Sequence, residues 1–112
     1  MPIVDNMKNN NSDLGQHLRD LRIAKGQTLH QLATEVDIDS PMLSKIERGD
    51  RLPTLEQIKK LSKYFKIEES DLKVMVTAER IIKDYGVNDT TYNAIRMVKE
   101  QIAPYIKKNR LK

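Results

Sequence analysis

Residues 29–48 read LHQLATEVDIDSPMLSKIER and predict two short helices joined by a tight turn. Two short helices that cross steeply need a small residue at the crossing, and Ala33 supplies it. The turn that follows needs a left-handed backbone conformation, which Asp37 tolerates better than most residues do. Leu43 and Ile46 give the second helix an apolar inner face at helical spacing. The outer face of that helix is therefore left free for other contacts.

Capping signals mark where these two helices begin. Thr28, followed three residues later by Gln31, forms a capping box that opens the first helix. The second helix begins at Asp39 or Ser40. If Ser40 is its cap, Pro41 occupies the first helical position, where proline is favoured.

The same apolar spacing predicts further helices on both sides of this stretch. One helix is expected over about 13–25, and another follows Thr54, which caps it. Two more are expected after Glu68, the last of which Pro104 should kink or end. Buried positions expected before residue 68 include Leu14, Leu18, Leu21, Leu55, Ile58, Leu61 and Phe65. No segment alternates with period two, so the predicted fold class is all-α, a compact helix bundle with a two-helix C-terminal extension.

The composition limits the chemistry of the 112 residues. This length fits one domain, or one small domain with an extension. Hydrophobic residues make up 38% and aromatic residues 4%, so the core must come mainly from Leu, Ile, Val and Met. Cys is absent, and His17 and His30 lie far apart without an acidic cluster, so we expect no metal site. Without a phosphate-binding loop or a Ser/His/Asp constellation, we expect no enzyme activity and no cofactor.

Charge and polarity divide the chain into three expected parts. The net charge of +4 and the pI near 9.3 permit polyanion binding without requiring it. Residues 1–12 are polar and Asn-rich and are expected to form a flexible arm, followed by a helical domain over 13–67 and the extension over 68–112. The arm lacks a signal peptide's apolar run, and no stretch approaches the roughly 20 apolar residues of a membrane helix, so a cytoplasmic location is expected.

The stretch LRDLRIAKGQTLHQLATEVDIDSPMLSKIERGDRLPTLEQIKKLSKYF resembles the Cro/repressor-like (Xre-like) helix-turn-helix family of DNA-binding transcription regulators. The segments LSKIERG and PTLEQIKKLSK are especially similar to the family. Asp37 is a departure, since the family usually has Gly there, but Asp reaches the same conformation at modest cost. The extension is similar to that of small regulators associated with restriction–modification loci. The resemblance implies a repressor that binds a palindromic operator in double-stranded DNA as a homodimer.

Carried over to this chain, the resemblance puts base-edge contacts at the start and outer face of the second helix of the motif. The positions are Ser40, Pro41, Ser44 and Lys45. Lys45 can donate to guanine, the serines can donate or accept, and Pro41 can only touch a thymine methyl group. Two alternatives stay open, namely that Ser40 is merely a cap and that Lys45 is a solvated lysine.

Phosphate contacts are expected from the start of the first motif helix and from the loop after the second. The candidates are Thr28, Gln31, Arg48 and Arg51. Gln31 has a capping role as its alternative, and Arg51 has an ion pair with Asp50 or Glu47. The family commonly pairs an Arg on the first helix with a Glu near the end of the recognition helix, here Arg22 and Glu47. Such a pair would relieve the cost of an unpaired charge on the apolar face of the first helix.

The extension is expected to form the dimer interface, because its apolar set is large for two helices alone. The residues are Leu72, Met75, Val76, Ile82, Tyr92, Ile95, Val98 and Ile102. The alternative is that they simply cap the core of the preceding domain. A second class of function is an antitoxin-type module that uses this fold to mask a partner protein. A third class, an enzyme accessory domain, is disfavoured by the polar and basic outer face of the recognition helix.

Overall fold

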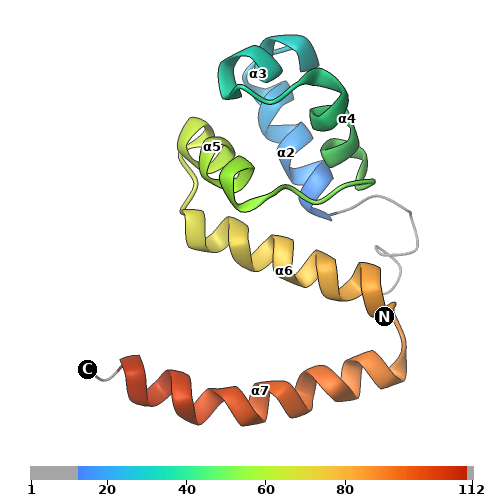
Figure 1. The fold of residues 1–112 in the computed structure, drawn as a ribbon, viewed down its shortest axis with the longest axis vertical. Coiled ribbons are helices and arrows are strands. Elements are labelled where there is room, and N and C mark those ends of the chain that lie inside the picture. Colours follow the sequence, from blue (N-terminus) through green and yellow to red (C-terminus); the bar gives the residue numbers. More distant parts are fainter. Residues whose placement is uncertain (1–12, 111–112) are drawn as a thin grey trace.

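The computed structural model describes residues 13–110, and the expected arm over 1–12 lies outside this range. Every regular element within these residues is an α-helix, which confirms the all-α fold class. In chain order the helices are α2 (Asp13–Ala24), α3 (Leu29–Val36), α4 (Ser40–Arg48), α5 (Leu55–Phe65), α6 (Glu69–Tyr85) and α7 (Asp89–Arg110). Figure 1 shows α2 to α5 grouped on one side of α6 and α7 on the other.

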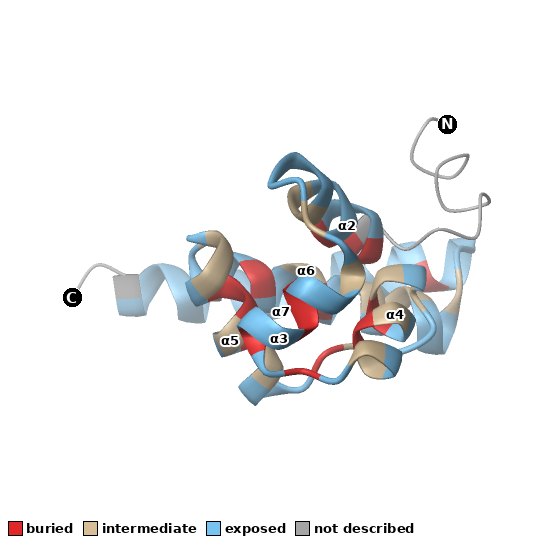
Figure 2. Cartoon of the chain, turned by 90° about the horizontal axis from the view of Figure 1, so that it is seen from above, coloured by how far each residue is buried: buried red, intermediate tan, exposed pale blue. Residues whose placement is uncertain are grey.

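Helices α2 to α6 share one hydrophobic core, whose buried residues appear red in Figure 2. The core residues are Leu14, Leu18, Leu32, Ala33, Val36, Ile38, Leu43, Ile46, Ile58, Leu61, Leu72 and Val76. The core is thus built from Leu, Ile, Val and Ala and contains no aromatic side chain. Because α6 contributes two of its members, the core extends beyond residue 67.

Two residues that were expected at a dimer interface are core residues. Leu72 and Val76 are only 0% and 5% exposed, and Met75 packs against the same cluster. The interface prediction is wrong for Leu72 and Val76, because α6 lies along α2 and α5 and turns this face toward them. Leu55 shows the opposite error: it is 67% exposed, since it begins α5 at the rim of a groove against α6.

Side-chain caps begin α3 and α4. The predicted capping box of α3 is present: Gln31 donates its N–H to Thr28 Oγ1 at 3.1 Å, and Thr28 donates its N–H to Gln31 Oε1 at 2.8 Å. The cap of α4 is Asp39, whose carboxylate accepts the N–H of the residue three positions later at 2.8 Å. Ser40 is therefore the first helical residue, and its interpretation as the cap is wrong. Its hydroxyl is left for other partners.

The turn between α3 and α4 depends on Asp37, which has the predicted left-handed backbone conformation (φ 54°, ψ 50°). A lysine on α5 supports it. Lys60 Nζ donates to the Asp37 carbonyl oxygen at 3.0 Å and lies 3.6 Å from the Asp37 carboxylate. Lys60 thus supports the backbone of a turn at a position that favours glycine.

Helices α2 and α4 approach so closely at Gly15 that no side chain fits between them. A Cβ atom on Gly15 would lie 2.7 Å from the Ile46 carbonyl oxygen and 2.9 Å from the Glu47 carbonyl carbon. Real Cβ atoms essentially never approach other atoms this closely. Glycine is required here because of the facing backbone and not because of a turn.

Polar contacts attach α6 to two separate points of the preceding helices. The N–H of Leu14, at the start of α2, donates to Glu79 Oε1 at 3.3 Å, where an acidic group complements the helix dipole. Lys83 Nζ donates to the carbonyl oxygens of Gly49 and Asp50, at 2.9 and 3.2 Å. Helix α6 therefore holds the start of α2 and the loop after α4 in place.

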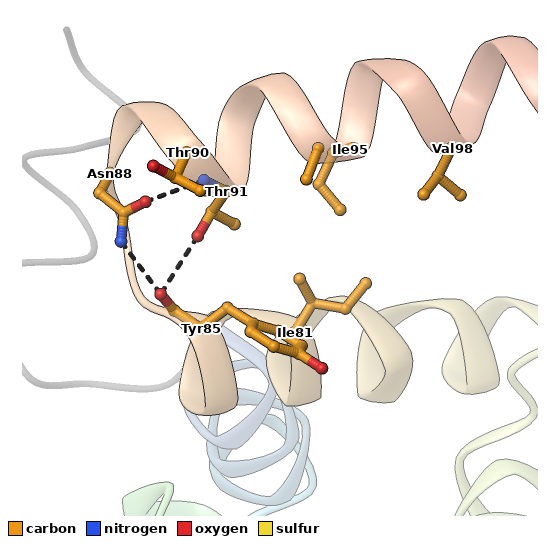
Figure 3. A pocket seen from close by; sticks show the side chains of 8 residues that line it. Ile81, Tyr85, Asn88, Thr90, Thr91, Ile95 and Val98 are labelled. Atoms are coloured by element: carbon orange, nitrogen blue, oxygen red, sulfur yellow. Dashed lines mark hydrogen bonds between the residues drawn. The ribbon is translucent and has the colours of Figure 1, made fainter.

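Helix α7 is joined to α6 by a compact corner that Figure 3 shows from close by. Asn88 Oδ1 accepts the Thr91 N–H at 2.8 Å, and both side chains donate to the Tyr85 carbonyl oxygen, at 3.0 and 3.1 Å. Beyond this cap, all residues over 92–109 are exposed. The helix does not end at Pro104 but continues to Arg110, since exposure lets water bond to the carbonyl that the proline leaves without a helical partner.

We expect Gly15→Ala to destabilise the protein, because the added Cβ overlaps the backbone of α4. Overpacking of this kind costs roughly 1–3 kcal/mol, which should exceed the ~1 kcal/mol that Ala gains over Gly inside a helix. Urea denaturation measures the change in the free energy of unfolding. The control is His17→Ala, a substitution of an exposed residue on α2, which should stay within about 0.5 kcal/mol of the parent protein. A Gly15→Ala protein as stable as the parent would contradict the contact between α2 and α4.

Candidate nucleic-acid interface

Helices α3 and α4 and the turn between them have the geometry of a helix-turn-helix. Ala33, 6% exposed, is the small residue of α3 that lies in the core. On α4, Leu43 and Ile46 are buried against the same core. The inner side of α4 is thus fixed by apolar packing, and its outer side faces away from the domain.

The four expected base-contacting residues lie on this outer side. Pro41 and Lys45 are exposed, whereas Ser40 and Ser44 are half-buried. Ser44 Oγ accepts a hydrogen bond from Arg48 Nη1 at 3.0 Å. The structure therefore brings the four residues together along little more than one turn of a single helix.

His30 is a neighbour of this surface that the sequence interpretation missed. Its Nδ1 atom lies 3.5 Å from Ser40 Oγ and links the start of α3 to the first turn of α4. A spacing of ten residues across two helices gives no periodic signal, so only the folded geometry shows this contact.

The expected phosphate contacts lie at the two ends of the motif. Thr28 and Gln31 are exposed at the start of α3, where their side chains form the capping box. Arg48 and Arg51 are exposed at the end of α4 and in the following loop. Arg48 Nε donates to Asp50 Oδ2 at 3.1 Å, and Glu47 pairs elsewhere, so the alternative that pairs Arg51 with either carboxylate is wrong.

Arg22 and Glu47 form a two-bond ion pair between α2 and α4, as the resemblance implies. Arg22 Nε and Nη2 donate to the two Glu47 oxygens at 2.8 and 3.0 Å, and Nη1 donates to the Gln27 carbonyl oxygen at 2.9 Å. The two side chains are only 13% and 6% exposed. The hydrogen bond to Glu47 raises the pKa of Arg22, against the lowering effect of burial. Because its pKa is raised on folding, charged Arg22 contributes stability at all pH values below arginine's ordinary pKa. This stability is lost only as the pH rises through the raised pKa, so Arg22 stays charged near neutral pH.

Within residues 13–110, no group of three or more His, Asp or Glu side chains is placed to hold a metal ion. Over the same part of the chain, none of the helices combines the length and the apolar character that crossing a membrane requires.

Comparisons with known proteins agree with this geometry. The helix-turn-helix family model matches residues 18–72, from within α2 to the start of α6. The chain is 44% identical over 62 residues to the uncharacterized HTH-type transcriptional regulator RghRB of Bacillus subtilis (strain 168), which covers 54% of this chain and 45% of that protein. It is 37% identical over 59 residues to the control protein C.BamHI of Bacillus amyloliquefaciens, and this alignment covers 52% of this chain and 73% of that protein.

The crystal structure of the clp gene regulator ClgR from Corynebacterium glutamicum has a similar fold. The TM-score is 0.50 at 21% identity, over 90% of this chain and 94% of that chain, so the likeness concerns the fold alone. The chain spans less than half the length of RghRB and about three quarters of C.BamHI. From the family match and these relatives, the chain belongs to the Xre-like helix-turn-helix family and carries its DNA-binding domain.

Arg22 and Glu47 should behave as one energetic unit. Removing one partner of a buried pair costs roughly 3–5 kcal/mol, because the other charge is left behind. We therefore expect Arg22→Ala and Glu47→Ala each to lower the free energy of unfolding strongly, and the double variant to lose less than the sum by about 0.5–3 kcal/mol. Urea denaturation of the parent protein, the two single variants and the double variant gives a double-mutant cycle. Strictly additive losses would show that the two side chains are not coupled.

Proposed function

We propose that this protein is a sequence-specific transcriptional regulator that inserts α4 into the major groove of an operator. One observation carries the proposal: α4 has a buried apolar face and an exposed polar and basic face. Leu43 and Ile46 hold the helix rigidly against the core. Lys45, on the exposed face, is a donor suited to guanine, beside two hydroxyl groups. Rigid support and exposed donors are what a recognition helix needs.

Backbone phosphates would be bound at both ends of the motif. Thr28 and Gln31 are exposed at the start of α3, where the positive end of the helix dipole suits an anion. Arg48 and Arg51 add two exposed cations at the other end. Contacts of this type orient the protein on the duplex and make its affinity depend on salt.

The proposed active form is a homodimer whose interface is formed mainly by α7. The apolar residues Ile95, Val98, Ile102 and Ile106 follow one another at spacings of three or four along the helix. They are 40–47% exposed and lie on one face, where they have nothing to cover them within the described chain. The same face lines an open apolar groove of about 540 Å³ against α6, which includes Ile81 and Tyr85 (Figure 3). A second copy would cover it in a two-fold contact.

A two-fold dimer would determine the symmetry of the operator and the spacing of its half-sites. The two α4 helices must reach major grooves about one turn apart, ~34 Å, on a pseudo-palindromic duplex. We propose repression by occupancy of this operator, in the cytoplasm and in association with the nucleoid. The dimer would also double the number of base contacts that one motif makes.

An antitoxin-type module is the second candidate, because the uncovered face of α7 also suits a different protein chain. The two candidates differ in what covers α7. The regulator requires a second copy of this chain, and the antitoxin requires an unlike partner.

Lys45→Ala and Arg48→Ala should affect DNA binding differently. Loss of Lys45 should relax preference at one base position, at a cost of about 1–3 kcal/mol, because a base-edge donor is removed. Loss of Arg48 should weaken binding to all sequences alike and reduce the salt slope by about one per protomer. Duplexes selected from a random pool, followed by titrations on matched and mismatched duplexes, measure both effects. Lys63→Ala, an exposed cation near the end of α5, is the control and should change neither.

If both substitutions shift every duplex by the same factor, Lys45 does not read a base. If selection with the parent protein enriches no sequence, specific regulation is rejected.

The double substitution Ile95→Glu and Ile102→Glu should convert the dimer into a monomer, because charges would be buried in an apolar interface. The domain should stay folded, since its core residues all precede α7. Sedimentation measures the mass, and Asn93→Glu, which helical geometry puts on the opposite face of α7, is the control and should leave the dimer intact. Truncation after Gly86 should also give a folded monomer.

A parent protein that is monomeric at micromolar concentration would reject the homodimer. The uncovered α7 face would then favour the antitoxin-type candidate.

A further inference from the structure

A polar groove of about 420 Å³ lies between α2 and α4, beside the outer face of α4. Three arginines reach it, Arg19 and Arg22 from α2 and Arg48 from α4. The lining also includes the Ser44 hydroxyl group and the carboxylates of Glu47 and Asp50. The groove is thus continuous with the candidate DNA surface, because Ser44 and Arg48 belong to both.

The arginines of the groove differ in how fully they are already paired with carboxylates. Arg22 and Glu47 neutralise each other through two short hydrogen bonds in a mostly buried position. Arg48 is held by Asp50 at 3.1 Å, but this pair is exposed, with both side chains 60% accessible, so it contributes little stability. Arg19 is exposed, and its guanidinium has no hydrogen bond or ion pair within residues 13–110.

Arg19 lies where an anion on the groove would meet it. Residues three positions apart share a helix face, so Arg19 and Arg22 project from α2 toward the same groove. Arg22 is committed to Glu47, which leaves Arg19 and Arg48 as the two guanidinium groups that can receive a ligand. Planar guanidinium groups bind phosphate oxygens through paired hydrogen bonds.

We infer that this groove binds one phosphodiester of the DNA backbone between Arg19 and Arg48, and that Asp50 competes with that phosphate for Arg48. The inference rests on the proposed DNA binding and adds to it a site on α2, outside the helix-turn-helix itself. In the unbound protein Asp50 occupies Arg48, and Lys83 fixes the loop by donating to the Asp50 carbonyl oxygen at 3.2 Å. Asp50 is therefore an acidic group at the edge of an anion site and lowers the affinity of that site.

The test compares Arg19→Gln, Asp50→Asn and the control Lys63→Gln in the full chain. Each is titrated with the selected duplex and with an unrelated duplex at several salt concentrations. Arg19→Gln should weaken binding to both duplexes by the same factor and make the slope of log K against log salt less negative by about 0.9 per protomer. Asp50→Asn should strengthen binding to both duplexes without flattening the slope. Lys63→Gln should leave the slope unchanged.

Ethylation of single phosphates gives an independent readout. Ethylation of one phosphate per half-site should interfere with binding of the parent protein and interfere less with binding of Arg19→Gln, which keeps Arg48 as its remaining partner. Unchanged slope and interference pattern in Arg19→Gln would overturn the groove assignment while leaving DNA binding intact. Weaker binding by Asp50→Asn would overturn the competition. A parent protein that binds neither duplex would instead reject the proposed function, and this inference with it.

Discussion

The ion pair between Arg22 and Glu47 joins α2 to α4, and the backbone of Glu47 also lies where Gly15 lets the two helices touch. Helix α4 has only nine residues and two fully buried side chains, so packing alone gives it few constraints. The two hydrogen bonds to Arg22 add a directional constraint at its far end, and Asp39 fixes its start. The exposed face of α4 and the groove beside it both depend on α4 having this one orientation.

Helix α6 connects this motif to the rest of the chain. It completes the core with Leu72 and Val76, and its Lys83 donates to the loop after α4. At its other end the Asn88 corner sets the direction of α7. In the proposed dimer, the distance between the two recognition helices would depend on α6, on the Asn88 corner and on how α7 pairs. A change in how α7 pairs would alter the spacing of the operator half-sites that the dimer can contact.

Much of the fold follows from local signals in the sequence. The capping box at Thr28 and the left-handed turn at Asp37 depend on neighbouring residues only, and both are present as predicted. The cap of α4 was ambiguous because Asp39 and Ser40 are adjacent and both suit a cap. Periodicity identified the apolar face of α6 but not its partner, so core residues were predicted at a dimer interface. The contact of His30 with Ser40 and the position of Arg19 beside α4 leave no periodic pattern and are seen only in the folded arrangement.

Hydroxyl-radical footprinting of the full chain on a duplex selected from random sequences tests the central claim most directly. We expect two protected segments per site, related by a two-fold axis, with their centres about one helical turn or ~34 Å apart. Lys45→Ala should keep this pattern at higher protein concentration. A single protected segment would contradict the two-fold dimer. Selection that yields no duplex with a footprint would contradict the assignment of α4 as a recognition helix.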